Sequence, residues 1–268
     1  MKKFLPLIGL AALLVILISV MIVSADNETV DFSGAPQFKG KCNVGVASIV
    51  GYLDTQRTED HVDSLSISQG IRSLALDDYA AIVLLIDSEG GYPPAAEEIS
   101  RAIDDIELPI AAFVRGYALS GGYWIAASAE HIVALETATI GNIGVTSSYL
   151  DEIGYNAKEG YAFQEIVSGE YKEVGNKDKP LTVEHRVYLQ EYTNDLFFLF
   201  MDVVRKNRGL TDAQVSLVSQ GKFYVAGKAK ELGLIDDIGG ITELKAYLSG
   251  RTNLETDELL FCEPTTFE

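Results

Sequence analysis

The strongest constraint on the fold comes from a strand-like run that ends in a glycine-flanked turn at Ser120. Residues 110–114 are apolar, Gly116 follows them, and Ser120 is followed at once by two glycines. The alanine-rich residues 125–129 then favour a helix. The pattern predicts a strand, a tight turn and a helix, with a serine hydroxyl at the N-terminus of the helix.

A serine in this position supports two interpretations. Serine is a preferred N-cap residue, so the role of Ser120 could be limited to satisfying free backbone N–H groups. The same N–H groups and the helix dipole also favour negative charge. This environment suits a nucleophile whose reaction generates an oxyanion, and the local sequence leaves both interpretations open.

A second glycine turn follows another buried strand. Residues 81–87 form a largely apolar run, and residues 88–91, Ser-Glu-Gly-Gly, lead into two prolines and a helical pattern. Parallel strands bring their carboxyl ends to the same edge of a sheet. The two turns are therefore expected to face each other across neighbouring strands.

Two further motifs complete a pattern. They are Gly-Asn-Ile-Gly-Val at residues 141–145 and Ser-Gly-Glu-Tyr-Lys at residues 168–172. With both turns and the closing residues 221–224 and 229–236, they resemble the signal peptide peptidase A family of membrane serine peptidases. The resemblance covers residues 44–240. It implies an α/β fold similar to the Clp protease subunit and the crotonases, a repeated ββα/βαβ superhelix with a mostly parallel sheet.

The resemblance assigns the catalytic pair. By the family pattern, Ser120 is the nucleophile and Lys172 is the general base. A lysine removes the proton of a serine only when burial disfavours its ammonium form, and it needs no third group to orient it. Spacing alone does not choose this lysine, because Lys158, Lys177 and Lys179 are also nearby in the sequence.

The resemblance also implies an oxyanion hole formed by the backbone N–H groups of Gly90 and Gly121. Two positions depart from the family pattern. Glu89 replaces the proline of a Ser-Pro-Gly-Gly turn, and Asn142 stands where a serine commonly holds the base lysine. An asparagine carbonyl also accepts a hydrogen bond from an ammonium group, so the orienting role is expected to persist.

Other catalytic classes have little support in the sequence. The histidines, His61, His131 and His185, lack the flanking patterns of a serine–histidine–aspartate triad and are expected to be structural. No Cys-x-x-Cys, His-Glu-x-x-His or phosphate-loop pattern occurs, so neither a metal nor another cofactor is expected. The net charge of −18, with no basic stripe, argues against a nucleic-acid partner.

Residues 1–25 are expected to form a transmembrane anchor. Lys2 and Lys3 precede an apolar run over residues 4–23, and about 20 residues suffice to cross a bilayer. The lysines place the N-terminus in the cytoplasm, which predicts a single-pass protein of the cell membrane with its peptidase domain outside. A cleaved secretory signal is the alternative, since residues 23–25, Val-Ser-Ala, offer a cleavage site.

The rest of the chain is expected to be one domain with short flanking segments. Residues 26–41 are interpreted as a tether, residues 42–248 as the peptidase domain and residues 249–268 as a loosely held polar tail. Apolar residues make up 47% of the sequence, which is enough for a sizeable core. Cys42 and Cys262 lie near opposite ends of this part of the chain. They could pair in an oxidising compartment, but the sequence does not place them within reach of each other, and we expect them to be unpaired.

Hydrophobic patterns predict the main elements of this domain. Strands are expected at residues 44–50 and 161–167, and helices at residues 95–106 and 184–208. The apolar coverage of the last helix is broad at residues 196–200, which indicates either burial within the monomer or packing between subunits.

The expected function is that of a membrane-anchored serine endopeptidase that digests cleaved signal peptides or membrane-proximal peptides. The resemblance implies a homo-oligomer in which Ser120 of one protomer meets Lys172 of another. Three alternatives stay open: a peptidase that trims a stomatin-like membrane partner, an inactive oligomeric scaffold suggested by Glu89 and Asn142, and a crotonase-type enzyme that would need neither Ser120 nor Lys172.

Overall fold

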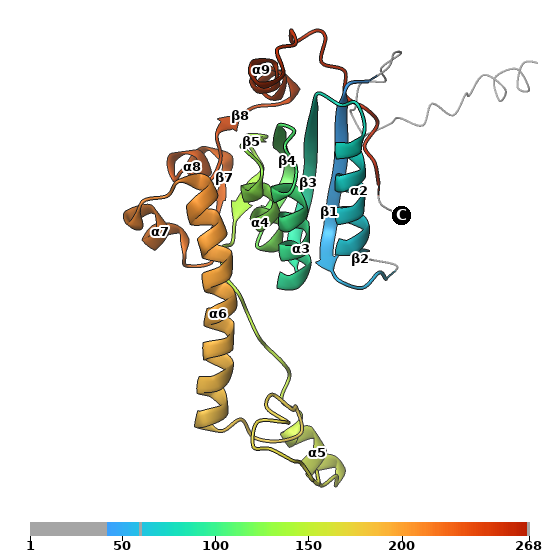
Figure 1. Cartoon of the computed structure of the whole chain (residues 1–268). Coiled ribbons are helices and arrows are strands. Elements are labelled where there is room, and N and C mark those ends of the chain that lie inside the picture. Colours follow the sequence, from blue (N-terminus) through green and yellow to red (C-terminus); the bar gives the residue numbers. More distant parts are fainter. Residues whose placement is uncertain (1–41, 59–60, 267–268) are drawn as a thin grey trace, which may run out of the picture. The chain divides into compact units, whose positions relative to one another are not determined.

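The computed structural model describes residues 42–58 and 61–266, which fold as an α/β domain (Figure 1). These residues contribute eight strands to one sheet, whose main path runs β2-β1-β3-β4-β5-β8, with β6 beside β4 and β7 beside β6. The strands are β1 (Val44–Asp54), β2 (His61–Asp63), β3 (Ala81–Gly91), β4 (Ile110–Leu119), β5 (His131–Ala134), β6 (Thr139–Gly141), β7 (Phe223–Val225) and β8 (Asp237–Ile238). All pairs are parallel except β6 with β7, which confirms the mostly parallel sheet.

Helices connect the strands and cover both faces of the sheet. They are α2 (Ser64–Leu76), α3 (Pro93–Asp104), α4 (Gly121–Ser128), α5 (Ile153–Glu159), α6 (Val183–Arg208), α7 (Asp212–Val218), α8 (Ala226–Glu231) and α9 (Ile241–Thr252). No helix of the described ranges is long and apolar enough to cross a membrane. The anchor expected at residues 1–25 and the tether expected at residues 26–41 lie outside these ranges.

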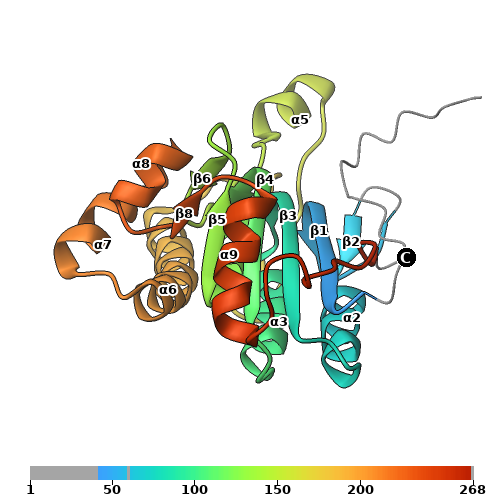
Figure 2. The same ribbon diagram turned by 90° about the horizontal axis from the view of Figure 1, so that it is seen from above.

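Successive side chains of the central strands point alternately into two apolar cores, one on each face of the sheet. In β3, Ile82 and Leu84 face a core that they share with α2, α3, α4 and α6. Ala81 and Val83 face the opposite core, which α9 closes with Leu244. Figure 2 shows α9 lying across β4 and β5. Successive residues of a strand point to opposite faces, so a sheet covered on both sides requires apolar residues at nearly every position.

Two sequence-based expectations about elements need correction. Residues 161–167 do not form a strand in the described structure; they have no regular secondary structure, and Ile166 is 99% exposed. The C-terminal tail is not loosely held, because Val44 pairs with Phe261 and Ala47 with Thr265 in bridges parallel to β1. A β-prone sequence forms a strand only where a partner strand and a half-buried surface are available.

The expectation that the cysteines are unpaired is wrong. Cys42 and Cys262 form a disulfide with a Cα–Cα distance of 5.1 Å across a sequence separation of 220 residues. The pairing of the tail with β1 brings them together, since the Cys262 N–H donates to the Val44 carbonyl at 2.9 Å. The sequence could not reveal this contact, because it depends on how the two ends of the domain meet.

Reduction of this disulfide is expected to destabilise the domain. A cross-link over so long a loop restricts the unfolded chain and contributes about 2–5 kcal/mol, which corresponds to a fall in Tm of about 4–20 °C. The check is a thermal melt of the chain with and without reductant. The double variant Cys42→Ser/Cys262→Ser is the control, because the chain has only these two cysteines. Equal melting of the oxidised chain and the double variant would contradict the prediction.

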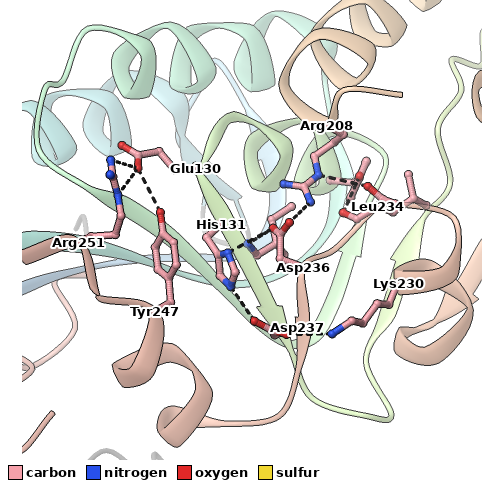
Figure 3. A network of polar contacts seen from close by, with 12 residues as sticks. Glu130, His131, Arg208, Lys230, Leu234, Asp236, Asp237, Tyr247 and Arg251 are labelled. Atoms are coloured by element: carbon pink, nitrogen blue, oxygen red, sulfur yellow. Dashed lines mark hydrogen bonds and ion pairs between the residues drawn. The ribbon is translucent and has the colours of Figure 1, made fainter. Parts of the chain in front are cut away.

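A polar network joins the end of α6 to β5 and β8 (Figure 3). The Asp236 carboxylate accepts a hydrogen bond from Arg208 at 2.6 Å, and His131 Nε2 lies 3.1 Å from the Asp237 carboxylate. Lys230 also binds Asp237, at 2.9 Å, and its hydrogen bond lowers the pKa of that carboxyl group. His131 therefore has the structural role expected from the sequence.

The same network continues to α9. The ring of Tyr247 stacks on His131 with a centroid distance of 3.9 Å, and its hydroxyl donates to Glu130 at 3.1 Å. Arg251 binds the same Glu130 oxygen at 2.8 Å. Burial, followed by the nearby Glu130 carboxylate, raises the pKa of Tyr247 to about 12, so the phenol stays protonated at neutral pH. These contacts fix α9 against the sheet at a distance from the Ser120 turn.

Candidate active site

Ser120 lies in a strained turn between β4 and α4. Its backbone has φ 49° and ψ −123°, a conformation that residues with a side chain rarely adopt. The Ser120 N–H donates to the Gly141 carbonyl at 2.9 Å, and its own carbonyl accepts from the N–H groups of Tyr123 and Trp124. The hydroxyl makes no capping hydrogen bond. Ser120 is therefore the N-cap residue by position, but its side chain is not used for capping.

The glycine turn at the end of β3 packs directly against Ser120. A Cβ atom at Gly90, whose φ is +98°, would lie 2.7 Å from the Ser120 Cβ and 2.7 Å from the Gly121 nitrogen. A Cβ atom at Gly91 would lie 2.1 Å from the Leu53 carbonyl oxygen. Only glycine fits both positions, which confirms that the two turns face each other.

The buried Ser88 holds this turn in place. Its hydroxyl donates to the Gly51 carbonyl at 2.6 Å and accepts the Gly90 N–H at 3.1 Å. The Gly90 N–H is thus already engaged, which differs from the expectation that it faces the substrate. The sequence could not predict that Ser88 holds this turn. Gly51 is distant in the sequence and comes near Ser88 only because β1 pairs with β3.

The N–H group of Gly91 is a candidate for facing a substrate, because that of Gly90 is bound to Ser88. Leu53 of β1 pairs with Gly91, and the Leu53 carbonyl accepts the N–H of Tyr92 at 2.8 Å. In a parallel ladder this register turns the Gly91 N–H away from β1. The nitrogen of Gly91 lies 3.4 Å from where a Cβ atom of Gly121 would be, so the two glycines are in contact. The Gly121 N–H stands in the first turn of α4, where helical amides lack an intrahelical partner.

Ser120 opens into a cavity of about 480 Å³. The ends of β1 and β3 form one wall, with Glu89 and Gly91, and the segment that follows β6 forms the other, with Asn142. Asn142 has φ 52°, and its Nδ2 donates to the Gly221 carbonyl at 2.8 Å. The side-chain oxygen remains as an acceptor, as the expected role of holding a lysine requires.

Lys172 does not line this cavity, and none of the residues that line the cavity is basic. Lys172 is exposed in the segment between α5 and α6. Figure 1 shows that α5 and its flanking loops lie near the N-terminal end of α6, well away from the sheet. Lys177 binds Glu152 at 2.5 Å and Lys179 binds Glu165, whereas no ion pair of Lys172 is found in the described part of the chain. The serine and the proposed base are therefore not brought together within one chain.

The chain beyond Asn142 presents a free backbone edge. Residues 144–151 run without a backbone hydrogen bond to any other described residue. Their first residues line the Ser120 cavity, and their later ones line a second cavity, of about 670 Å³, against Arg186 and Leu189 of α6. An extended segment with unpaired N–H and C=O groups is a template for another strand.

Two further residues stabilise the region around Ser120, and no sequence pattern predicted their roles. Asp87 accepts the Tyr117 N–H at 2.9 Å where the register of β3 and β4 shifts, so it stabilises the turn region before Ser120. Tyr123 is fully buried, and its hydroxyl donates to the Leu234 carbonyl at 2.8 Å. Burial raises the pKa of this phenol, which therefore serves as a neutral donor that anchors α4.

Comparison with known proteins gives one family. Residues 102–255, more than half of the chain, match the model of peptidase family S49. A putative protease of Methanocaldococcus jannaschii is 29% identical over 69% of this chain and 60% of its own length. A putative signal peptide peptidase SppA of Enterococcus faecium is 33% identical over 59% of this chain and 47% of its own. A chloroplastic serine protease SPPA of Arabidopsis thaliana is 29% identical over 66% of this chain and 26% of its own. The match thus spans less than two thirds of each of these relatives.

Proposed function

Because the chain belongs to peptidase family S49, we propose that it is a serine endopeptidase whose nucleophile is the Ser120 hydroxyl. The observation that carries the proposal is the turn at Ser120. Its backbone is held at φ 49°, and its hydroxyl is not spent on capping the helix that follows. Strain of this kind persists where the surrounding structure fixes a side chain for function.

The chemistry is acyl transfer to water. The Ser120 Oγ attacks the carbonyl carbon of the scissile peptide bond while its proton passes to the base. The N–H groups of Gly91 and Gly121 stabilise the resulting oxyanion. The base then gives the proton to the leaving amine, which departs as the peptide bond breaks. An acyl-enzyme ester on Ser120 remains. Water, deprotonated by the same base, attacks this ester, and the base returns the proton to the Ser120 oxygen as the ester bond breaks. Gly91 takes the place that the sequence suggested for Gly90, whose amide is bound to Ser88.

The base in this proposal is Lys172 of a second copy of the chain. No basic side chain lines the cavity of the same chain, while Lys172 is exposed on a segment distant from the sheet. Asn142 would accept a hydrogen bond from the incoming lysine. Exposed apolar side chains in the segment between α5 and α6 and on α6 itself support assembly into a homo-oligomer. Among them are Ile166, with 99% of its surface exposed, Phe198 with 63% and Leu199 with 56%.

Peptide substrates are proposed to bind in extended form. A peptide lying along residues 144–148 would pair with backbone groups that have no partner among the described residues, and it would pass over Ser120. Cleaved signal peptides and membrane-proximal peptides are the proposed substrates, and the resemblance to signal peptide peptidase A supports them. In this proposal, residues 1–25 anchor the protein in the cell membrane. The fold is proposed to be related to that of the Clp protease and the crotonases.

The proposal is tested by hydrolysis of quenched fluorescent peptides with small apolar residues, using the purified full-length chain in detergent. We expect a rise in fluorescence and, by mass spectrometry, new termini inside the peptide rather than at its ends. A folded, oligomeric chain that cleaves no peptide and no unfolded protein would contradict the proposal. That result would favour an inactive scaffold of the same fold.

A further inference from the structure

One carboxylate, that of Glu89, lines the cavity that also contains the proposed nucleophile. Glu89 lies on the β3 turn, one residue before Gly90, and it lines the same cavity as Ser120. Its side chain is exposed, and no ion pair or hydrogen bond of its carboxylate is found within residues 42–58 and 61–266. The turn that carries it is fixed by the buried Ser88, so the carboxylate is attached to a rigid support.

The surroundings of Glu89 suit a cation. Tyr52 and Tyr92 line the cavity beside it, with 46% and 47% of their surfaces exposed. A carboxylate next to aromatic rings provides both charge attraction and cation–π contact for an ammonium or guanidinium group. None of the residues that line the cavity carries a positive charge. Among the described residues that line the cavity, none therefore offsets the negative charge of Glu89.

We propose that Glu89 makes this site selective for peptides with lysine or arginine close to the scissile bond. The inference rests on the proposed function, because it needs Ser120 to be the point of cleavage. A basic side chain of the bound peptide would approach Glu89 over the rings of Tyr52 and Tyr92. An acidic side chain at the same position would be repelled. A basic side chain of a neighbouring copy of the chain could bind Glu89 instead of the peptide. The experiment below distinguishes these two possibilities.

The test uses the full-length chain and its Glu89→Gln and Glu89→Lys variants. A peptide library, with cleavage sites identified by mass spectrometry, first shows which position near the cut favours lysine or arginine. Two peptides that differ only by lysine or norleucine at that position are then compared. We expect the native chain to cleave the lysine peptide with about tenfold higher kcat/KM. Glu89→Gln should bring the ratio close to one, and Glu89→Lys should favour peptides with aspartate or glutamate.

The matched control is Glu107→Gln. Glu107 is an exposed carboxylate in the loop before β4, at the opposite end of the strand from Ser120, so this variant should keep the native preference. Cleavage without a preference for basic residues overturns the inference, as does a preference that survives in Glu89→Gln. An equal loss toward both peptides also overturns it, since Glu89 would then act on the catalytic machinery or on a neighbouring copy. A native chain that cleaves nothing instead contradicts the proposed function.

Discussion

Replacing Ser120 by alanine is expected to lower kcat/KM for peptide hydrolysis by at least about 10⁴-fold, because the variant has no group to form the acyl-enzyme. The fold should persist. The Ser120 hydroxyl makes no capping hydrogen bond, so its loss is expected to change the free energy of unfolding by less than about 1 kcal/mol. Steady-state hydrolysis and thermal unfolding of the same preparation check both statements.

Ser73→Ala is the matched control for this variant. Ser73 is exposed on α2, far from the turn in the sequence, and its removal should leave both activity and melting temperature unchanged. Lys172→Ala should be as inactive as Ser120→Ala, because the base is then missing from every site of the oligomer. Residual hydrolysis of more than a few per cent in Ser120→Ala would show that another residue is the nucleophile.

The second large effect is expected for Gly91→Ala. The new Cβ atom would lie 2.1 Å from the carbonyl oxygen and 2.5 Å from the nitrogen of Leu53. These are backbone atoms of a paired strand, so no side-chain rotation relieves the clash. The turn has to move, which removes the Gly91 N–H from the oxyanion. We expect a loss of at least about 100-fold in kcat/KM and a destabilisation of about 2–4 kcal/mol, measured by hydrolysis and denaturant unfolding.

Gly227→Ala provides the control for this substitution. Gly227 lies in α8, and a Cβ atom there would meet nothing within 4 Å. Alanine is the better helix former, so this variant should be as stable as the native chain or more stable by up to about 1 kcal/mol, with unchanged activity. If Gly91→Ala cleaves peptides at the native rate, then neither the close contact with Leu53 nor the proposed oxyanion hole is correct.

The sequence was sufficient to predict the two turns that meet at Ser120. Residues 81–86 and 110–114 are apolar over their whole length, and a buried parallel strand needs this pattern because both faces are covered. Glycine then marks the end of each strand. The structure confirms a turn at Ser120 followed directly by a helix, and it places the turn of Gly90 and Gly91 against that serine.

Features that depend on distant contacts could not be predicted in the same way. The disulfide between Cys42 and Cys262 needs the tail to pair with β1, and Ser88 binds Gly51 only because β1 and β3 are neighbours. Residues 161–167 have the composition of a strand, yet they are exposed and unpaired in one chain. In the proposed oligomer, a second copy would supply the surface that such a sequence prefers.

The most direct test of a site shared between copies is to combine the two inactive variants. Ser120→Ala and Lys172→Ala chains with different tags are co-expressed, and oligomers that contain both are isolated. Each variant alone should be inactive. Mixed oligomers should regain up to about one quarter of native hydrolysis, since random assembly pairs an intact Ser120 with an intact Lys172 at about one interface in four. Mixed oligomers without any hydrolysis, beside an active native chain, would contradict the sharing of Ser120 and Lys172 between protomers.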